Sequence, residues 1–136
     1  MSTNLEIIED ALRDINVISE IQSASAEQGA FGLRKLNQVM EASKEMSINF
    51  GWFSQTATTD TAPIPDWAEI GITAGLSIAM APKYGASISP ELAAIADTFT
   101  NLIIRKSLSE KLKNTDMSHL PVGTGNSRSQ NIITGR

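Results

Sequence analysis

The chain has 136 residues, a net charge of −4 and no cysteine, and its one histidine is His119. This length suits one domain with its own core, whereas the lack of cysteine excludes disulfides and a lone histidine leaves a catalytic triad or histidine-rich metal site incomplete. The longest apolar run, residues 70–81, is too short and too interrupted to cross a bilayer, and the N-terminus lacks a signal-peptide pattern, so we expect a soluble protein without a cofactor.

Two helices are predicted in the first third of the chain. Thr3 and Glu6 have the spacing of a capping box, and a helix over residues 4–15 follows from the one-sided apolar positions Leu5, Ile8, Leu12 and Ile15. A second helix is predicted to begin near Ser25, with an apolar face of Leu33, Leu36, Val39 and Met40. Two glycines in its first turns weaken this second helix.

Residues 48–65 lose helical periodicity and are predicted to form a loop with a short β-hairpin. A loop this long in a small domain is commonly functional. It carries the aromatic residues Phe50, Trp52 and Phe53, for which two interpretations stay open. They anchor a partner, as aromatic residues often do at interfaces, or they cover one end of a helical bundle.

A third helix is predicted from Asp66, which forms a second capping pattern with Glu69, to about Ala81. This helix is apolar nearly all round and is therefore expected at the centre of the fold. Pro82 and Gly85 are expected to end it. A neighbouring helix is expected to approach closely at two glycines four residues apart, Gly71 and Gly75.

The fourth helix has the clearest start, with Ser89 as N-cap and Pro90 at the first helical position. It continues to about Lys113 and carries one apolar stripe, composed of Leu92, Ile95, Ala96, Phe99, Leu102 and Ile103. Four helices predict an all-α, four-helix bundle-like domain over residues 1–113. The polar residues 114–136 are expected to form an extended C-terminal arm.

Charge is divided unevenly along the chain and argues against nucleic-acid binding by the body. Residues 1–104 carry 13 acidic and 5 basic side chains, a net −8, whereas residues 105–136 carry 2 and 6, a net +4. Phosphate neutralisation supplies most of the affinity for nucleic acid, so an acidic body binds it poorly. The basic end of the fourth helix either complements that helix's own C-terminus or contacts an acidic partner.

Catalysis is not expected from the sequence. The paired carboxylates are better explained by exposed helix faces and helix caps than by acid–base chemistry. The Gly123-Thr124-Gly125 segment resembles a phosphate-binding loop in composition only, because it lacks the preceding strand, the following helix and the lysine of such loops. Within the arm, Leu120-Pro121-Val122 is an apolar, pre-extended group that suits ordering on a partner, the alternative being terminal disorder.

The sequence resembles the head-to-tail adaptor proteins of tailed bacteriophages, also called head-completion or packaged-DNA-stabilisation proteins, of the podovirus type. The end of the first helix and the second helix match, as do the aromatic turn after it, the buried third helix with its Pro-Tyr-Gly end, and a Pro-x-Gly-x-Gly-Asn segment. These matches lie in residues 11–17, 33–40, 50–52, 76–85 and 120–126. The chain stops soon after Asn126, where some of these proteins continue.

The resemblance implies a structural virion protein at the head–tail junction, assembled in the host cytoplasm. Twelve copies would form a ring beneath the portal protein, extend the DNA channel without binding DNA specifically, and provide the platform for the next tail or nozzle protein. The portal-binding arm would comprise Leu120, Pro121, Val122, Gly123, Gly125 and Asn126. The aromatic residues Phe50, Trp52 and Phe53 are assigned to neighbours in the ring or to the next tail component. The alternative function is a small helical hydrolase of cell-wall glycan, and a helix-turn-helix regulator ranks below both because no basic recognition helix is present.

Overall fold

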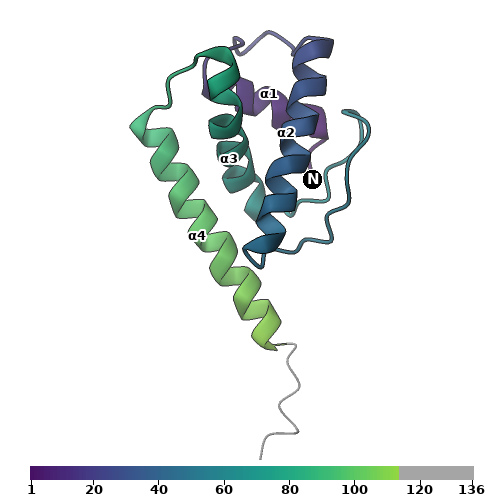
Figure 1. The fold of residues 1–136 in the computed structure, drawn as a ribbon, viewed down its shortest axis with the longest axis vertical. Coiled ribbons are helices and arrows are strands. Elements are labelled where there is room, and N and C mark those ends of the chain that lie inside the picture. The colour runs from purple at the N-terminus through teal and green to yellow at the C-terminus, as the bar shows by residue number, and fades with distance from the viewer. Residues whose placement is uncertain (114–136) are drawn as a thin grey trace, which may run out of the picture.

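The computed structural model describes residues 1–113, and these residues form four α-helices without a β-sheet (Figure 1). The helices are α1 (Asn4–Asp14), α2 (Ala26–Glu45), α3 (Asp66–Tyr84) and α4 (Pro90–Lys113). The all-α, four-helix prediction is therefore confirmed. The predicted arm, including every residue from Leu120 to Asn126, lies outside the described residues.

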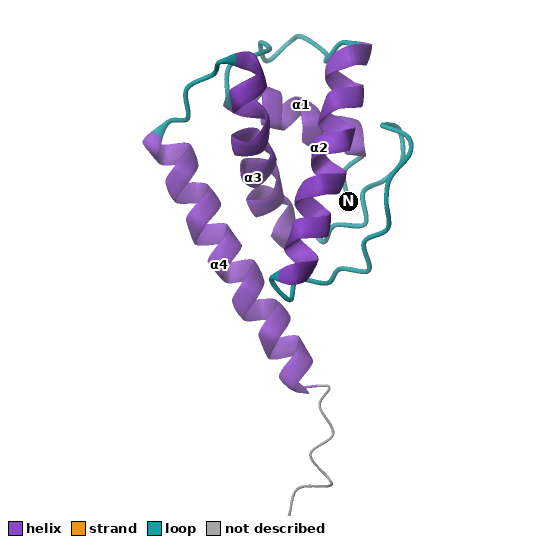
Figure 2. Cartoon of the chain, in the orientation of Figure 1, coloured by secondary structure: helices purple, strands orange, loops and turns teal. Residues whose placement is uncertain are grey.

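The central helix is α3, as its all-round apolar sequence predicts. It packs against α1, α2 and α4, while α1 also packs against α2. Figure 2 shows α4 running beside α3 and then continuing past the end of the other helices. The core therefore lies mainly between α1, α2 and α3, where Ile8, Leu12, Leu36, Leu76 and Met80 are fully buried.

The helix starts follow their capping residues closely. Thr3 and Glu6 form the predicted capping box: the Thr3 backbone N–H donates to Glu6 Oε2 at 2.7 Å, and Glu6 N–H donates to Thr3 Oγ1 at 3.3 Å. Ser25 begins α2 with a second capping box, and Ser89 Oγ accepts the backbone N–H of Leu92 at 3.1 Å before α4. These side chains satisfy backbone donors that a helix start leaves without partners.

Helix α3 begins at Asp66, as predicted, but its cap and its C-terminal end differ from the prediction. Its N-cap is Pro65, whose side chain makes no capping bond, so the predicted capping pattern of Asp66 and Glu69 is wrong. Helix α3 also continues through Pro82 and ends only where Gly85 adopts a left-handed conformation with φ of 60°. Pro82 removes one backbone donor, but the residues after it keep theirs, and the Gly85 N–H donates to the carbonyl oxygens of Ala81 and Pro82 in the last turn.

The loop between α2 and α3 contains no β-hairpin within the residues described, contrary to the prediction. Its backbone carbonyl groups instead accept hydrogen bonds from the first residues of α1. The N–H groups of Asn4 and Leu5 donate to the carbonyl oxygens of Asp60 and Thr58, at 2.9 and 2.8 Å. An isolated bridge pairs Thr3 with a residue further along the same loop. The loop carbonyls are used to cap a helix, which leaves them unavailable for strand pairing.

Candidate functional site

The three aromatic residues of the loop occupy different environments. The Trp52 side chain is 5% exposed and belongs to the core. Phe50 packs edge-on against Trp67, with 5.7 Å between the ring centroids. Phe53 is 64% exposed, so it is the one of the three aromatic side chains that presents most of its surface to solvent. The bundle-covering interpretation describes Trp52 and Phe50, and only Phe53 remains available for a partner.

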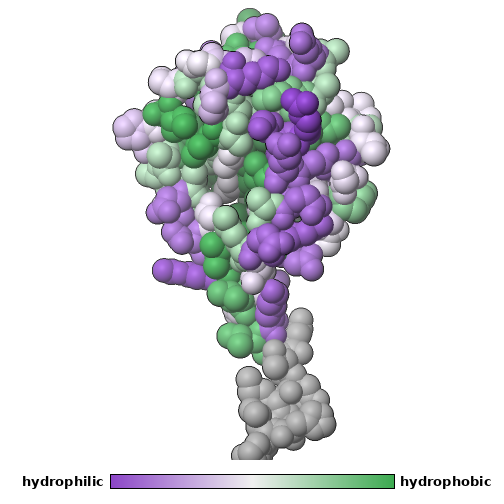
Figure 3. Space-filling model, viewed as in Figure 1, coloured by the Kyte–Doolittle hydropathy of each residue, from purple (hydrophilic) through white to green (hydrophobic). Residues whose placement is uncertain are grey.

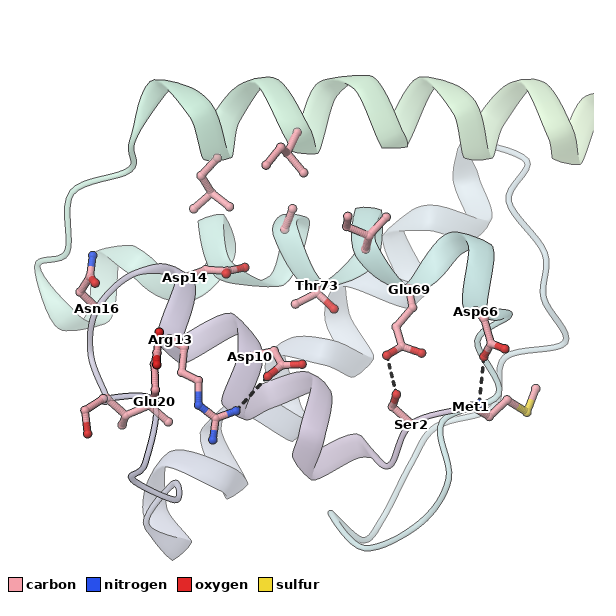
Figure 4. Close-up of a pocket in the computed structure, with 16 residues that line it drawn as sticks. Met1, Ser2, Asp10, Arg13, Asp14, Asn16, Glu20, Asp66, Glu69 and Thr73 are labelled. Atoms are coloured by element: carbon pink, nitrogen blue, oxygen red, sulfur yellow. Dashed lines mark hydrogen bonds and ion pairs between the residues drawn. The ribbon is translucent and has the colours of Figure 1, made fainter.

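A groove of about 1120 Å³ lies between α1, α3, α4 and the N-terminal residues (Figure 4). Four apolar side chains from α3 and α4 line it, namely Ile70, Ala74, Leu92 and Ile95. Ile70 is 48% exposed and Ile95 is 39% exposed, although both lie on predicted apolar faces. The groove therefore offers apolar surface that this chain leaves uncovered within residues 1–113.

The rim of this groove is acidic. Asp10, Asp14, Glu20, Asp66 and Glu69 line it, against Arg13 and the amino group of Met1. In Figure 4 the carboxylates of Asp14, Asp10, Glu69 and Asp66 follow one another along the groove. We call this surface, with its apolar lining, the acidic groove.

Most rim carboxylates have a local partner. Asp10 accepts from Arg13 at 2.8 Å, and Glu69 accepts from the Ser2 hydroxyl at 2.5 Å. Asp66 lies 2.9 Å from the amino group of Met1. These contacts are largely exposed to solvent and each contributes little stability. They hold the carboxylates in place and leave part of their charge facing the groove.

Asp14, on the rim of the acidic groove, has a raised pKa. Burial of its carboxyl raises the pKa, the hydrogen bond from Ser77 opposes this rise, and the nearby Asp10 adds to it. The residue as a whole is exposed, but its Oδ2 faces the buried Ser77 hydroxyl at 3.1 Å. Desolvation of one carboxylate oxygen is therefore the physical cause of the higher pKa.

A second uncovered surface lies on α4. Of the predicted apolar stripe, Leu92, Ala96 and Ile103 are buried against the body, whereas Leu102 is exposed. Leu102, Arg105, Leu108 and Leu112 recur every three or four residues, on the side of α4 opposite buried Ile103 and Ser107. We call these four residues the α4 stripe. Figure 3 shows hydrophobic side chains gathered along this projecting end of the helix.

A third cluster places cations around one aromatic ring at the α2–α3 contact. Lys83 Nζ lies 3.8 Å from the centroid of the Phe31 ring, and the Arg34 guanidinium carbon lies 5.4 Å from it. Tyr84 meets the same ring edge-on at 6.0 Å. This arrangement covers Phe31 with cation–π contacts and aliphatic stems, so it serves packing.

Sequence reasoning missed both the acidic groove and the α4 stripe. Groove residues come from separate parts of the chain, so no local spacing joins them. Leu108 and Leu112 could have indicated the α4 stripe, because these apolar residues lie four positions apart beyond the end of the predicted apolar stripe. Residues 1–113 hold no cluster of His, Asp or Glu arranged to bind a metal ion, and none of their helices is long and apolar enough to cross a membrane.

No protein-family model matches the chain, and no curated protein matches it.

Proposed function

We propose that this protein is a structural connector that joins a phage portal to its tail as one subunit of a ring. The resemblance of its sequence to head-to-tail adaptors suggests this function, and three features of the described fold support it. They are a helical body, an acidic surface and a fourth helix that leaves the body.

The observation that carries the proposal is where the chain leaves the bundle. Helix α4 extends past α2 and α3, and every residue from Leu108 to Lys113 is exposed (Figure 1). Residue 114, the first residue of the arm, thus follows a helix tip that stands away from the body. An arm starting at such a tip meets a neighbouring molecule more readily than its own core. The arm would supply Leu120, Pro121 and Val122 as apolar anchors on the portal.

The charge of the body suits a channel that DNA must pass through. Residues 1–104 carry a net −8. Like charge disfavours phosphate contacts, so DNA can slide past such a surface without binding to it. A ring also strengthens a weak arm, because each docked copy raises the effective concentration of the others.

The test measures binding of the full-length chain to the portal protein of the same genome, by native mass spectrometry and electron microscopy of negatively stained particles. We expect a ring on the portal for the unchanged chain. Leu120→Asp with Val122→Asp should weaken this binding at least about tenfold, the effect of losing 1.4 kcal/mol. The matched control is Ser127→Asp with Ser129→Asp, which adds the same charge to the arm without removing an apolar side chain. Binding that is absent, or that is weakened equally by both pairs, contradicts the proposal.

A glycan hydrolase is the second candidate, favoured by one specific observation. The acidic groove brings Asp14, whose pKa is raised, into one surface with Asp10 and Glu69. Glycosidases use such pairs, one carboxyl protonated and one ionised. The unchanged chain should then cleave cell-wall glycan, and the Asp14→Asn variant should not. The control variant Asp97→Asn, on the exposed face of α4, should cleave it as the unchanged chain does. Equal activity of the unchanged chain and Asp14→Asn, or no cleavage at all, excludes this function.

A further inference from the structure

The two uncovered surfaces of this chain are complementary in charge. The acidic groove has five carboxylates on its rim. The end of α4, residues 105–113, has four basic residues and one acidic residue. Within the described residues neither Arg105 nor Lys113 forms an ion pair with a carboxylate. Surfaces of opposite sign attract each other and fix the register of an interface.

The two surfaces are also complementary in apolar character and in shape. Ile70 and Ile95 offer apolar area inside the acidic groove, and Leu108 and Leu112 offer it on the α4 stripe, with Leu112 66% exposed. A volume of about 1120 Å³ exceeds the roughly 300–1000 Å³ of pockets that hold small molecules. An open groove of this size suits a polypeptide segment. A single helix with exposed leucines, as α4 is beyond Ile103, is such a segment.

The far end of the α4 stripe, at Leu112, does not reach the acidic groove of its own molecule. Gly71 of α3 lies against Phe99 and Ile103 of α4, which fixes where the two helices cross. Leu112 is nine residues beyond Ile103, or about 13 Å further along a straight helix. It therefore lies well away from Ile70, the neighbour of Gly71 in the chain.

We propose that the α4 stripe of one copy docks in the acidic groove of a second copy of this chain. Because the two surfaces are different, the contact is head-to-tail, and repeating it with a fixed rotation closes a ring or extends a filament. The leucines would lie on Ile70 and Ile95, while Arg105 and Lys113 would meet the carboxylates of the rim. This contact deepens the proposed connector and rests on that function for its place in the ring. The surfaces that define it are those of the described residues.

The absence of cysteine allows a direct test by disulfide trapping in the full-length chain. Ile70→Cys and Leu112→Cys are mixed under oxidising conditions at about 1 mM protein, a concentration close to the Kd of a contact of millimolar affinity. A disulfide requires the two Cα atoms to approach within roughly 7 Å, so random encounters give a low yield. Met46→Cys, on exposed Met46 at the end of α2, replaces the groove variant in the control mixture.

We expect at least about tenfold more of the Ile70→Cys with Leu112→Cys product than of the control product. A single chain carrying both cysteines should give a ladder of covalent oligomers, as a head-to-tail contact requires. Equal yields in the two mixtures overturn the proposal. So does a ladder that stops at dimers, which indicates a two-fold pairing of α4 with α4. Ile95→Cys provides a second position in the groove should Ile70→Cys fail to fold.

Charge reversal tests the electrostatic part of the contact. Adding Arg105→Glu to the Leu112→Cys chain should lower the cross-link yield several-fold, because it places a carboxylate against an acidic rim. Arg34→Glu makes the same charge change on α2 and should leave the yield unchanged. Equal yields with both reversals contradict the role of Arg105. Cross-linking of the free protein tests this contact alone, whereas portal binding tests the connector, so failure of one is distinguishable from failure of the other.

Discussion

Gly32 of α2 lies directly on Ile8 of α1. A Cβ atom at Gly32 would stand 2.4 Å from Ile8 Cγ2 and 3.3 Å from Ile8 Cβ. Ile8 is fully buried, so it has no free space to move into. The glycine that weakens α2 as an isolated helix is therefore what lets the two helices pack closely.

Gly32→Ala is expected to destabilise the protein. Alanine favours a helix by about 1 kcal/mol over glycine, but overpacking a core costs about 1–3 kcal/mol and Ile8 is close to the backbone here. We expect a net loss of up to about 2 kcal/mol, measured as the free energy of unfolding in urea. A stabilised Gly32→Ala variant would show that α1 and α2 are not packed as described.

Gly75→Ala is the matched control and should act in the opposite direction. A Cβ at Gly75 meets no atom within 4 Å, and Gly75 lies inside α3. Only helix propensity changes, so stability should rise by about 0.5–1 kcal/mol. A loss at Gly75 would mean that another helix covers it. Urea unfolding of both variants under the same conditions separates packing from propensity.

Asn37 is expected to be required for the position of the loop between α2 and α3. Its side chain donates to the Gln55 carbonyl at 2.9 Å and accepts the Gln55 N–H at 2.8 Å. Gln55 in turn accepts from the fully buried Asn4 through its side chain at 3.2 Å. Asn37→Ala leaves both Gln55 backbone groups without partners and should cost about 1–3 kcal/mol.

The control for Asn37 is Asn101→Ala, because Asn101 is exposed on α4. It should change stability by less than about 0.5 kcal/mol. Hydrogen exchange adds a local measurement: Asn37→Ala should lower protection of the Asn4 and Leu5 amides, which the same loop caps. Unchanged protection of these two amides would show that the position of the loop does not affect the start of α1.

Trp52 and Phe53 are adjacent aromatic residues whose substitution should change stability by very different amounts. Trp52 is buried, so Trp52→Ala should cost about 3–5 kcal/mol through the cavity it leaves. Phe53 is mostly exposed, so Phe53→Ala should change stability by less than about 0.5 kcal/mol. Thermal unfolding measures both. A reduction of ring assembly by Phe53→Ala without loss of stability would assign Phe53 to an interface.

The sequence predicted the helices well because their signals are local. Capping at Thr3 and at Ser89 depends on residues three positions apart, so the starts of α1 and α4 follow directly from spacing. The predicted close approach of a neighbouring helix at the two α3 glycines is found at only one of them. A Cβ at Gly71 would lie 2.8 Å from Ile103 and 2.9 Å from Phe99, whereas Gly75 has open space. Spacing identifies a face that permits close approach, but the crossing angle decides which glycine is used.

The loop and the groove could not be predicted because their partners are distant in the chain. Thr58 and Asp60 cap α1 more than 50 residues away, and no periodicity records such a bond. The Asp66–Glu69 spacing was misleading for the same reason, since the N-terminal residues bind both carboxylates and leave no side-chain cap at α3. Local patterns specify helices, whereas these surfaces arise only when the chain has folded.

Asp14→Asn is expected to stabilise the protein at neutral pH. The Ser77 hydroxyl has one hydrogen and two acceptors, Asp14 Oδ2 at 3.1 Å and the Thr73 carbonyl at 2.9 Å. A neutral Asp14 can donate to the Ser77 oxygen, so that Ser77 donates to Thr73 and both bonds form. The amide of asparagine can also donate to the Ser77 oxygen, and it carries no charge that burial would desolvate. The variant should therefore be more stable than the unchanged chain.

The sign of the pH dependence follows from the direction of the pKa shift. The pKa of Asp14 is raised above 3.8 in the folded state, so the folded protein holds this proton more tightly than the unfolded chain. The stabilising contribution is fully present below pH 3.8 and is lost as the pH rises through the folded-state pKa. Asp14→Asn should therefore exceed the unchanged chain in unfolding free energy at pH 7, and this difference should shrink on acidification. Urea unfolding between about pH 3 and 7 measures this difference in unfolding free energy, with Asp97→Asn as the charge-matched control. If the variant stays more stable at the lowest pH, or if the control gains equal stability, the effect does not arise from the Asp14–Ser77 contact.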